Sequence, residues 1–324
     1  MFSSLSNLIG FVPTLEALPL VAELSSESDW KMEPCPSYGR VIRQMLAGQI
    51  STGLLPFEVF LIEILSRPAL LDRWCVPMVL PAAPIELVMS QRMMKQIQQS
   101  HQHRATPPIH SMVIGIESRN SLTRHQFIAW QRAHPGLEEA KPVFKMLPME
   151  LMQQAMIAES IDGFVVPTPW GIAAEAPSDG RLIADFNSGK LGQQLVLCCH
   201  RNVVEAASGA WDALPGRLAA RRGILANSTE RDAAIKTMHR LGRPHCDADA
   251  CVRSADLYFA TMSKDEFIPN EEWLTKQIER LARLIPVVAR ATGLLNLARS
   301  LAYVRSGSRP HAATPLDQSS RLDC

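Results

Sequence analysis

The sequence lacks the features that mark several large classes of protein. Its 33 basic and 32 acidic residues almost cancel, to a formal net charge of +1, so no overall positive field exists to capture nucleic acid or an anionic membrane. No apolar run is long enough to cross a membrane. No glycine-rich phosphate loop, Gly-x-Ser-x-Gly turn or His-Glu-x-x-His motif occurs. Composition and motifs therefore argue against a nucleic-acid-binding protein and against a membrane-spanning protein. They also argue against the enzyme families that carry these motifs.

The cysteines lack the pattern of a disulfide framework or a zinc site. There are seven, an odd number, and no two have the Cys-x-x-Cys spacing. Cys198 and Cys199 lie inside an apolar run and are expected to be buried thiols, while His245, Cys246 and Cys251 lack the spacing of metal ligands. We therefore predict free thiols in a reducing compartment, with no metal and no cofactor.

The first residues also lack the pattern of a secretory signal. They contain no basic region, and their apolar segment is interrupted by Pro13, Glu16 and Pro19. Together with the thiols, this favours a cytoplasmic protein. A periplasmic location is the alternative if a leader precedes this sequence.

What the sequence does contain is an alternation of short apolar runs with amphipathic segments, over about two thirds of its 324 residues. This alternation is typical of an α/β fold, and the length allows two lobes with separate cores. Strands are predicted at residues 7–13, 31–35, 50–55, 74–80, 85–90, 111–117, 142–147, 163–166, 181–184 and 194–199. Helices are predicted between them at residues 38–47, 92–99, 122–132 and 150–159.

Beyond His200 the pattern changes from alternating to helical. Long helices are predicted at residues 203–225, 230–241, 249–261 and 271–300. Residues 305–324 are polar and aperiodic, and we expect a flexible tail there.

Three segments, in this order, resemble one known family. The first is IGFVPTLEALPLVAE, at residues 9–23. The second is AELSSESDWK followed by YGRVIRQMLAGQISTGLLP, up to residue 56. The third is MELMQQAMIAESIDGFVVPTPWGIAAEA, at residues 149–176. Their order and spacing across roughly residues 7–205 resemble the nitrate and bicarbonate type of ABC-transporter solute-binding protein, whose cytoplasmic branch senses nitrate and nitrite.

The resemblance implies a periplasmic-binding-protein type II fold, with two α/β lobes, a ligand cleft between them and a helical C-terminal region. Residues 1–90 and 190–304 would form lobe 1 with the C-terminal helices, and residues 91–189 would form lobe 2. The family is not catalytic, so the resemblance implies no enzymatic activity. It works by closing its lobes on a ligand and presenting the closed form to a partner.

The same resemblance implies where the ligand would bind. In such a fold the cleft is lined by strand ends and by the helix N-termini that follow them, which suit anions. The candidate ligand-binding residues at such places, with one on the last strand, are Thr14, Leu54, Ser118, Ser121, Thr123, His125, Thr168, Trp170 and Gln194. Ser121 has a second interpretation as a plain helix cap. Family members can carry a basic residue just before the last strand, where this chain has Gln193 and Gln194, and Arg119, Arg124 or His125 could supply that charge instead.

Two functions follow as expectations. One is a non-catalytic cytoplasmic sensor of a small, nitrate-like anion, similar to the sensors that hold an RNA-binding antiterminator protein until ligand arrives. The other is the solute-binding component of an ABC transporter for nitrate, bicarbonate or a related solute, with a permease and ATPase as partners. A relict or fused regulatory domain is a third possibility.

Overall fold

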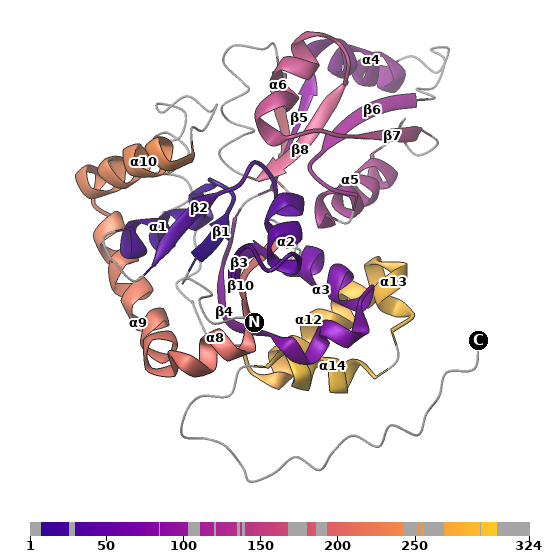
Figure 1. Ribbon diagram of the computed structural model, residues 1–324. Coiled ribbons are helices and arrows are strands. Elements are labelled where there is room, and N and C mark those ends of the chain that lie inside the picture. The colour runs from indigo at the N-terminus through magenta and orange to yellow at the C-terminus, as the bar shows by residue number, and fades with distance from the viewer. Residues whose placement is uncertain are drawn as a thin grey trace.

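The structure contains two separate five-stranded sheets. It is a computed structural model, and it describes residues 8–25, 30–83, 85–102, 111–119, 121–134, 137, 140–167, 180–185, 193–242, 252, 255, 269–291 and 293–302. Figure 1 shows the two sheets in different parts of the molecule, each with its own helices. We call the part built on β1–β4 and β10 lobe 1, and the part built on β5–β9 lobe 2.

The sheet of lobe 1 has the strand order β2-β1-β3-β10-β4. Its first three strands are mutually parallel, and β10 runs antiparallel to both β3 and β4. The carboxyl ends of β1, β2, β3 and β4 therefore meet at one edge of the sheet. The strands are β1 (Leu8–Phe11), β2 (Lys31–Pro34), β3 (Thr52–Pro56), β4 (Trp74–Ala83) and β10 (Gln193–His200).

The sheet of lobe 2 has the order β7-β6-β8-β5-β9. Its strands β6, β7 and β8 are parallel, and β5 is antiparallel to β8 and β9. The strands are β5 (Ile85–Ser90), β6 (Ser111–Ile116), β7 (Lys141–Met146), β8 (Gly163–Pro167) and β9 (Gly180–Asp185). All ten strands predicted from the sequence are present, with ends that differ by a few residues.

The chain crosses between the sheets twice, from β4 to β5 and from β9 to β10. Because β5 lies in the second sheet, residues 85–90 belong with lobe 2, whereas the sequence division placed them in lobe 1. The apolar run through residue 90 is continuous with that of β4, so hydropathy alone gives no sign of the crossover.

The helices cover the faces of the two sheets. Helices α4, α5 and α6 belong to lobe 2, and α9 and α10 pack against α1 of lobe 1 (Figure 1). The α-helices are α1 (Leu18–Leu24), α2 (Tyr38–Leu46), α3 (Phe57–Leu65), α4 (Gln91–Gln102), α5 (Leu122–Ala133), α6 (Met149–Ile157), α8 (Arg201–Ala206), α9 (Ser208–Leu225), α10 (Ser228–Gly242), α12 (Glu271–Leu284), α13 (Pro286–Ala289) and α14 (Leu294–Leu301). Two 3-10 helices, η1 (Leu15–Ala17) and η2 (Pro68–Arg73), complete the set of described elements.

Two long helices expected in the C-terminal third are broken in the structure. The helix predicted at residues 203–225 is interrupted at Ala207, which separates α8 from α9. The helix predicted at residues 271–300 becomes α12, α13 and α14. Pro286 cannot donate the hydrogen bond that would continue α12, and Gly293, at φ 76°, adopts a left-handed conformation before α14. Of the helix predicted at residues 249–261, only Val252 and Ala255 are described, and both are helical. The tail at 305–324 lies outside the described residues.

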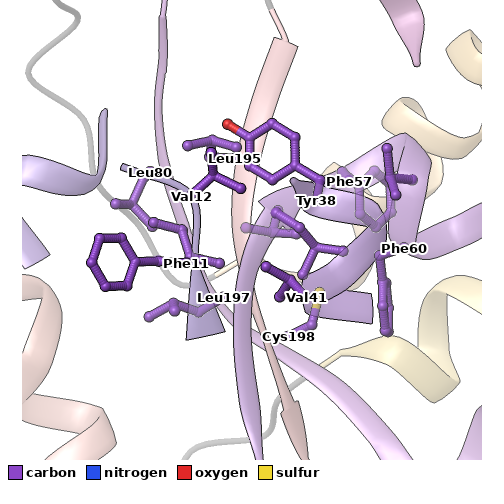
Figure 2. Packing of buried hydrophobic residues seen from close by; sticks show 14 of the residues in the cluster. Phe11, Val12, Tyr38, Val41, Phe57, Phe60, Leu80, Leu195, Leu197 and Cys198 are labelled. Atoms are coloured by element: carbon purple, nitrogen blue, oxygen red, sulfur yellow. The ribbon is translucent and has the colours of Figure 1, made fainter. Parts of the chain in front are cut away.

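The larger apolar cluster is centred on lobe 1 and continues into lobe 2, where Val88, Leu122, Met152 and Phe164 belong to it. Figure 2 shows Phe11, Val41, Phe57 and Phe60 packed in this core with residues of β4 and β10. A second, smaller cluster around Phe127 lies within lobe 2. Among the described helices, none is both long and apolar enough to cross a membrane.

Gly163, in the IDGF segment, has a steric reason to be glycine. A Cβ at this position would lie 2.6 Å from the carbonyl oxygen of Val88 and 2.4 Å from the sulfur of Met89 on the paired strand β5. The preceding Asp162 accepts a hydrogen bond from the Val113 backbone at 2.8 Å and pairs with Arg92 at 2.7 Å. The segment therefore fixes the packing of β8 between β5 and β6.

Candidate functional site at the boundary between the lobes

A direct hydrogen bond joins the two lobes where the strands of both sheets end. Glu58, in the first turn of α3 and directly after β3, accepts a hydrogen bond from the backbone N–H of Leu122 at 3.2 Å. Leu122 is the first residue of α5, in lobe 2. Since a helix N-terminus has unpaired N–H groups and a partial positive charge, the Glu58 carboxylate occupies a position that would suit a bound anion.

Beside this contact lies a group of buried polar atoms from lobe 1. Thr14 follows β1 and is fully buried, Glu16 in η1 is 2% exposed, and Tyr38 at the start of α2 is 1% exposed. The Thr14 hydroxyl lies close enough to lower the pKa of both Glu16 and Tyr38. Even so, no described residue forms a well-aligned hydrogen bond with Thr14 Oγ1, Glu16 Oε2 or the Tyr38 hydroxyl. Three buried polar side chains in one place thus carry unused hydrogen-bonding capacity.

Two carboxylates from lobe 2 face the same place. Glu86, on β5, is 4% exposed and raises the pKa of Glu16 by charge repulsion. Glu117, directly after β6, accepts a hydrogen bond from Ser121 Oγ at 3.3 Å. Glu16, Glu58 and Glu117 all raise the pKa of Tyr38, so the phenol lies among them. We call Glu16, Glu58, Glu86 and Glu117 the inter-lobe carboxylate cluster.

Burial sets the protonation of the centre of this cluster. Removal from water raises the pKa of the Glu16 carboxyl from 4.5 to about 7, with a smaller contribution from Glu86. Burial likewise raises the pKa of Tyr38 well above 10, so its hydroxyl remains a donor at neutral pH. Glu16 therefore exchanges a proton near neutral pH.

The turn before α5 is shaped by its own hydrogen bonds. Ser121 caps the helix, since its Oγ accepts from the Thr123 N–H at 3.3 Å and from the Thr123 hydroxyl at 2.8 Å. Ser118 is partly exposed, and its carbonyl accepts from the Ser121 N–H at 3.2 Å. The capping interpretation of Ser121 is confirmed, and the predicted ligand contacts of these three residues stay predictions.

The remaining predicted ligand residues lie in different surroundings. Thr14 lies in the polar group described above. Leu54 is a core residue of β3, 1% exposed and paired in register with Leu197. Gln194 is partly exposed on β10, at an irregularity in the pairing with β4. Thr168 and Trp170 lie outside the described residues.

The three suggested cations lie in different surroundings. Arg119 is exposed. Arg124 lies over the Phe144 ring, 5.2 Å from its centre. Burial, with a contribution from Arg124, lowers the pKa of His125, which is therefore neutral at pH 7. The described cation near the cluster is Arg280 of α12, which interacts electrostatically with Glu58.

Sequence reasoning did not place Glu16, Tyr38, Glu58, Glu86 or Glu117 among the candidate ligand-binding residues. A usable signal was present, because Glu58 interrupts the apolar run LLPFEVFLIEIL and Glu86 interrupts PIELVM. A carboxylate inside an apolar run at a strand end is a candidate site residue, because burying a charge costs free energy unless the charge has a partner.

The opposite edge of the lobe 1 sheet contains a separate cavity of about 130 Å³. It lies between the end of α2, the start of β3 and the start of β4, and its lining includes Arg73, Trp74 and His200. Burial, with a contribution from Arg73, lowers the pKa of His200. The lining is mainly apolar, with Arg73 and His200 as its basic side chains, unlike the carboxylates of the inter-lobe boundary.

Comparison with known proteins identifies the fold. No protein-family model and no curated protein sequence matches the chain. Solved structures do match. The periplasmic nitrate-binding protein NrtA from Synechocystis PCC 6803 has a TM-score of 0.67 at 11% identity, covering 91% of this chain and 85% of that one. The periplasmic aliphatic sulphonate-binding protein SsuA from Escherichia coli has a TM-score of 0.64 at 13% identity, covering 95% and 96%.

A third match is the ligand-binding component of an ABC-type import system from Staphylococcus aureus, solved with zinc bound. Its TM-score is 0.63 at 12% identity, covering 86% of this chain and 90% of that one. The two-lobed architecture expected from the sequence is thus confirmed. The chain has the periplasmic-binding-protein fold of ABC-type solute-binding proteins.

Proposed function

We propose that this protein is a non-catalytic small-ligand-binding protein that closes its two lobes around a ligand and acts as a cytoplasmic sensor or regulator. The observation that carries the proposal is the set of buried polar groups at the inter-lobe boundary, which both lobes supply. Glu58 already bonds across the boundary to Leu122, while Thr14, Glu16 and Tyr38 keep polar atoms without partners among the described residues. A ligand seated there would bond to both lobes at once.

The fold supports lobe closure as the mode of action. Two lobes built on separate sheets, between which the chain crosses twice, can move relative to each other with little change inside either sheet. A ligand that contacts both lobes stabilises the closed arrangement by its differential affinity. The closed form then presents a different surface to a partner.

The described thiols support a reducing compartment. Cys35, Cys75, Cys198 and Cys199 are free and buried. In the sensor role, the partner would be a protein that one lobe arrangement binds and the other releases. An RNA-binding antiterminator is the candidate that the sequence resemblance supplies, and a nitrate-like anion is its candidate ligand.

A second candidate function is the solute-binding component of an ABC importer. It is favoured by the likeness to binding proteins for nitrate and for sulphonate, which are described as periplasmic. In that role the closed form would dock on a permease and its ATPase.

Small-angle scattering of the full chain tests closure. We expect the radius of gyration to fall when a small-molecule extract of the native cells is added, and to return after dialysis. The same radius with and without extract would contradict lobe closure.

Pull-down and fractionation separate the two roles. A tagged chain in native lysate should retain a soluble protein partner whose amount changes when the extract is added. Recovery of the untagged protein in the periplasmic fraction, or of a permease as its partner, would replace the sensor role by the importer role.

A further inference from the structure

The cavity at the opposite edge of the lobe 1 sheet has the size of a small ligand. It measures about 130 Å³ and lies where α2 ends and where β3 and β4 begin. An apolar cavity of about 150 Å³ in another protein stays free of water and holds a benzene molecule. The cavity beside α2 is therefore large enough for about one six-membered ring.

Most of the side chains around this cavity are apolar. They come from the end of α2, the segment before β3, η2 and the start of β4, and include Met45, Leu46, Ala47, Ile50, Leu70 and Trp74. The buried Trp74 ring meets the His200 ring edge to face, with centroids 5.5 Å apart and an angle of 71° between the planes. A wall of this kind favours a ligand with an apolar body, which gains free energy by leaving water and by packing on the aromatic ring.

The polar backbone groups at the end of α2 already have partners within the chain. Gly48, at φ 70°, has the left-handed conformation that ends many helices. Its N–H donates to the Met45 carbonyl at 3.0 Å, and the Gln49 N–H donates to the Gln44 carbonyl at 2.9 Å. The helix carbonyls that would attract a cation to a helix C-terminus are thus occupied.

The charge at the cavity comes from Arg73. This residue ends η2, is exposed to solvent, and forms no ion pair with any residue that the structure describes. Burial, with a further contribution from the Arg73 charge, lowers the pKa of His200, so the guanidinium lies near this ring. His200 is therefore neutral at pH 7, since its pKa lies below the ordinary 6.5. One available positive charge thus lies at the rim of an apolar cavity.

We propose that this cavity is a second ligand site, which binds a small organic acid whose apolar body is about the size of one six-membered ring. The body packs between α2 and η2 against Trp74. The carboxylate lies at the rim, where the Arg73 guanidinium donates to it and solvent reaches it. Because the head group keeps contact with water, binding avoids the cost of burying a charge. The site lies at the opposite edge of the sheet from the inter-lobe boundary and does not depend on the proposed function.

Other classes of occupant fit the cavity less well. A protonated amine would meet the Arg73 charge, and none of the described lining residues is acidic. Water would meet mostly apolar side chains, whereas a buried water requires two to four polar partners. A small inorganic anion would pair with Arg73 and leave the apolar wall without a contact. An organic acid uses both features of the cavity.

Calorimetric titration of the full-length chain tests the charge and the size of the ligand. Benzoate and cyclohexanecarboxylate carry a ring and a carboxylate. Benzyl alcohol and benzylamine carry the ring with a neutral or a positive head group, and acetate carries the carboxylate without a ring. We expect both ring acids to bind, benzyl alcohol to bind at least about tenfold more weakly, and benzylamine and acetate to show no measurable binding, because charge-assisted hydrogen bonds are stronger than neutral ones.

Variants locate the site. Arg73→Gln removes the exposed charge and should weaken benzoate binding at least about tenfold, while the affinity for benzyl alcohol stays unchanged. Leu70→Phe fills the cavity from η2 and should abolish binding of both compounds. The matched control Arg132→Gln removes one exposed arginine from α5 in lobe 2 and should leave both affinities unchanged. Urea denaturation checks that each variant is folded, and Leu46→Phe is a second filling variant, from α2.

Each contrary result overturns a stated part of this inference. Unchanged affinity for benzoate in Arg73→Gln, or equal affinities of the wild type for benzoate and benzyl alcohol, would overturn the acid as the ligand class. Unchanged affinity in a folded filling variant, or no binding of any ring compound, would overturn the site itself. None of these results bears on lobe closure, which the scattering experiment tests with a different ligand.

Discussion

The two edges of the lobe 1 sheet have opposite chemistry. The edge where β1 and β3 end carries Glu16 and Glu58, with buried polar atoms that lack partners among the described residues. The edge where β3 and β4 begin carries Arg201, whose guanidinium donates to the carbonyls of Asp72 at 3.3 Å, Trp74 at 3.2 Å and Ser300. The Arg201 guanidinium is thus bonded to carbonyls of the chain itself, whereas at the other edge Thr14 Oγ1, Glu16 Oε2 and the Tyr38 hydroxyl have no hydrogen-bond partner among the described residues.

This difference separates the structural role of Arg201 from a binding role. Both edges hold charged groups that burial desolvates, so perturbed pKa values occur at both and do not distinguish them. What distinguishes Arg201 from Thr14, Glu16 and Tyr38 is whether their polar atoms already bond to the described chain, because an unpaired buried group costs free energy that a ligand can recover. Substitution of Arg201 should therefore lower stability, whereas substitution of Glu16 should change the pH dependence of stability and ligand binding.

The largest expected effect is at the basic edge. Arg201→Ala removes the bonds that join η2, β4 and α14, and should lower the free energy of unfolding by about 3 kcal/mol, since bonds to charged donors are worth about 1.5–3 kcal/mol each. Urea denaturation measures the loss. Arg201→Lys keeps the charge with fewer hydrogen-bond donors, so its free energy of unfolding should lie between those of the wild type and Arg201→Ala. A loss within about 0.5 kcal/mol, as at an ordinary surface position, would contradict the structural role.

At the acidic edge the expected change in the free energy of unfolding has the opposite sign, because removing the Glu16 charge should stabilise the protein. The Glu16 pKa is raised from 4.5 to about 7, so the folded state binds more protons than the unfolded state between these values. The contribution of Glu16 to stability is complete below about pH 4.5 and is lost as pH rises through about 7. At about 1.4 kcal/mol per pKa unit, Glu16→Gln should stabilise the ligand-free protein by up to about 3 kcal/mol at about pH 8, and hardly at all at about pH 4.

Chemical denaturation of both proteins across this pH range measures the effect, with Glu279→Gln, which removes one exposed carboxylate from α12, as the control. Equal stability of wild type and Glu16→Gln at every pH would show that Glu16 is not desolvated.

The bond between the lobes should have an intermediate effect. Glu58→Ala leaves the Leu122 N–H of α5 without its acceptor and should cost about 1–2 kcal/mol, as the loss of a helix cap does. Hydrogen exchange at the Leu122 amide should become faster, while exchange in β1 stays unchanged. Slower or equal exchange at Leu122 would indicate that the bond does not persist in solution.

The smallest effect is expected among the thiols of the basic edge. The Thr52 hydroxyl and Cys199 sulfur lie 2.9 Å apart, and both side chains are fully buried. Thr52→Val keeps the shape and removes this weak hydrogen bond, so we expect a loss of about 0.5–1 kcal/mol by urea denaturation. Thr52→Ser keeps the hydroxyl and removes a methyl group, so it separates the contribution of the hydrogen bond to stability from that of packing. A gain in stability from valine would show that the hydroxyl contributes nothing.

Much of the fold could be read from the sequence. Ten strands and the helices between them follow from hydrophobic periodicity, and the order of the segments around residues 9–56 and 149–176 gave the two-lobed architecture. Ser121 was recognised as a possible cap because its residue type and its place before an apolar repeat define the local geometry. These features depend on neighbours within a few residues.

Tertiary structure alone decided the rest. The pairing of β5 with β8, which moves residues 85–90 to lobe 2, depends on partners far away in the sequence. The inter-lobe carboxylate cluster has members at residues 16, 58, 86 and 117, which are far apart in the sequence. Burial raises the pKa of Glu16, and the fold brings the four carboxylates to one boundary. Desolvation and repulsion act through space, so local sequence shows only that Glu58 and Glu86 interrupt apolar runs.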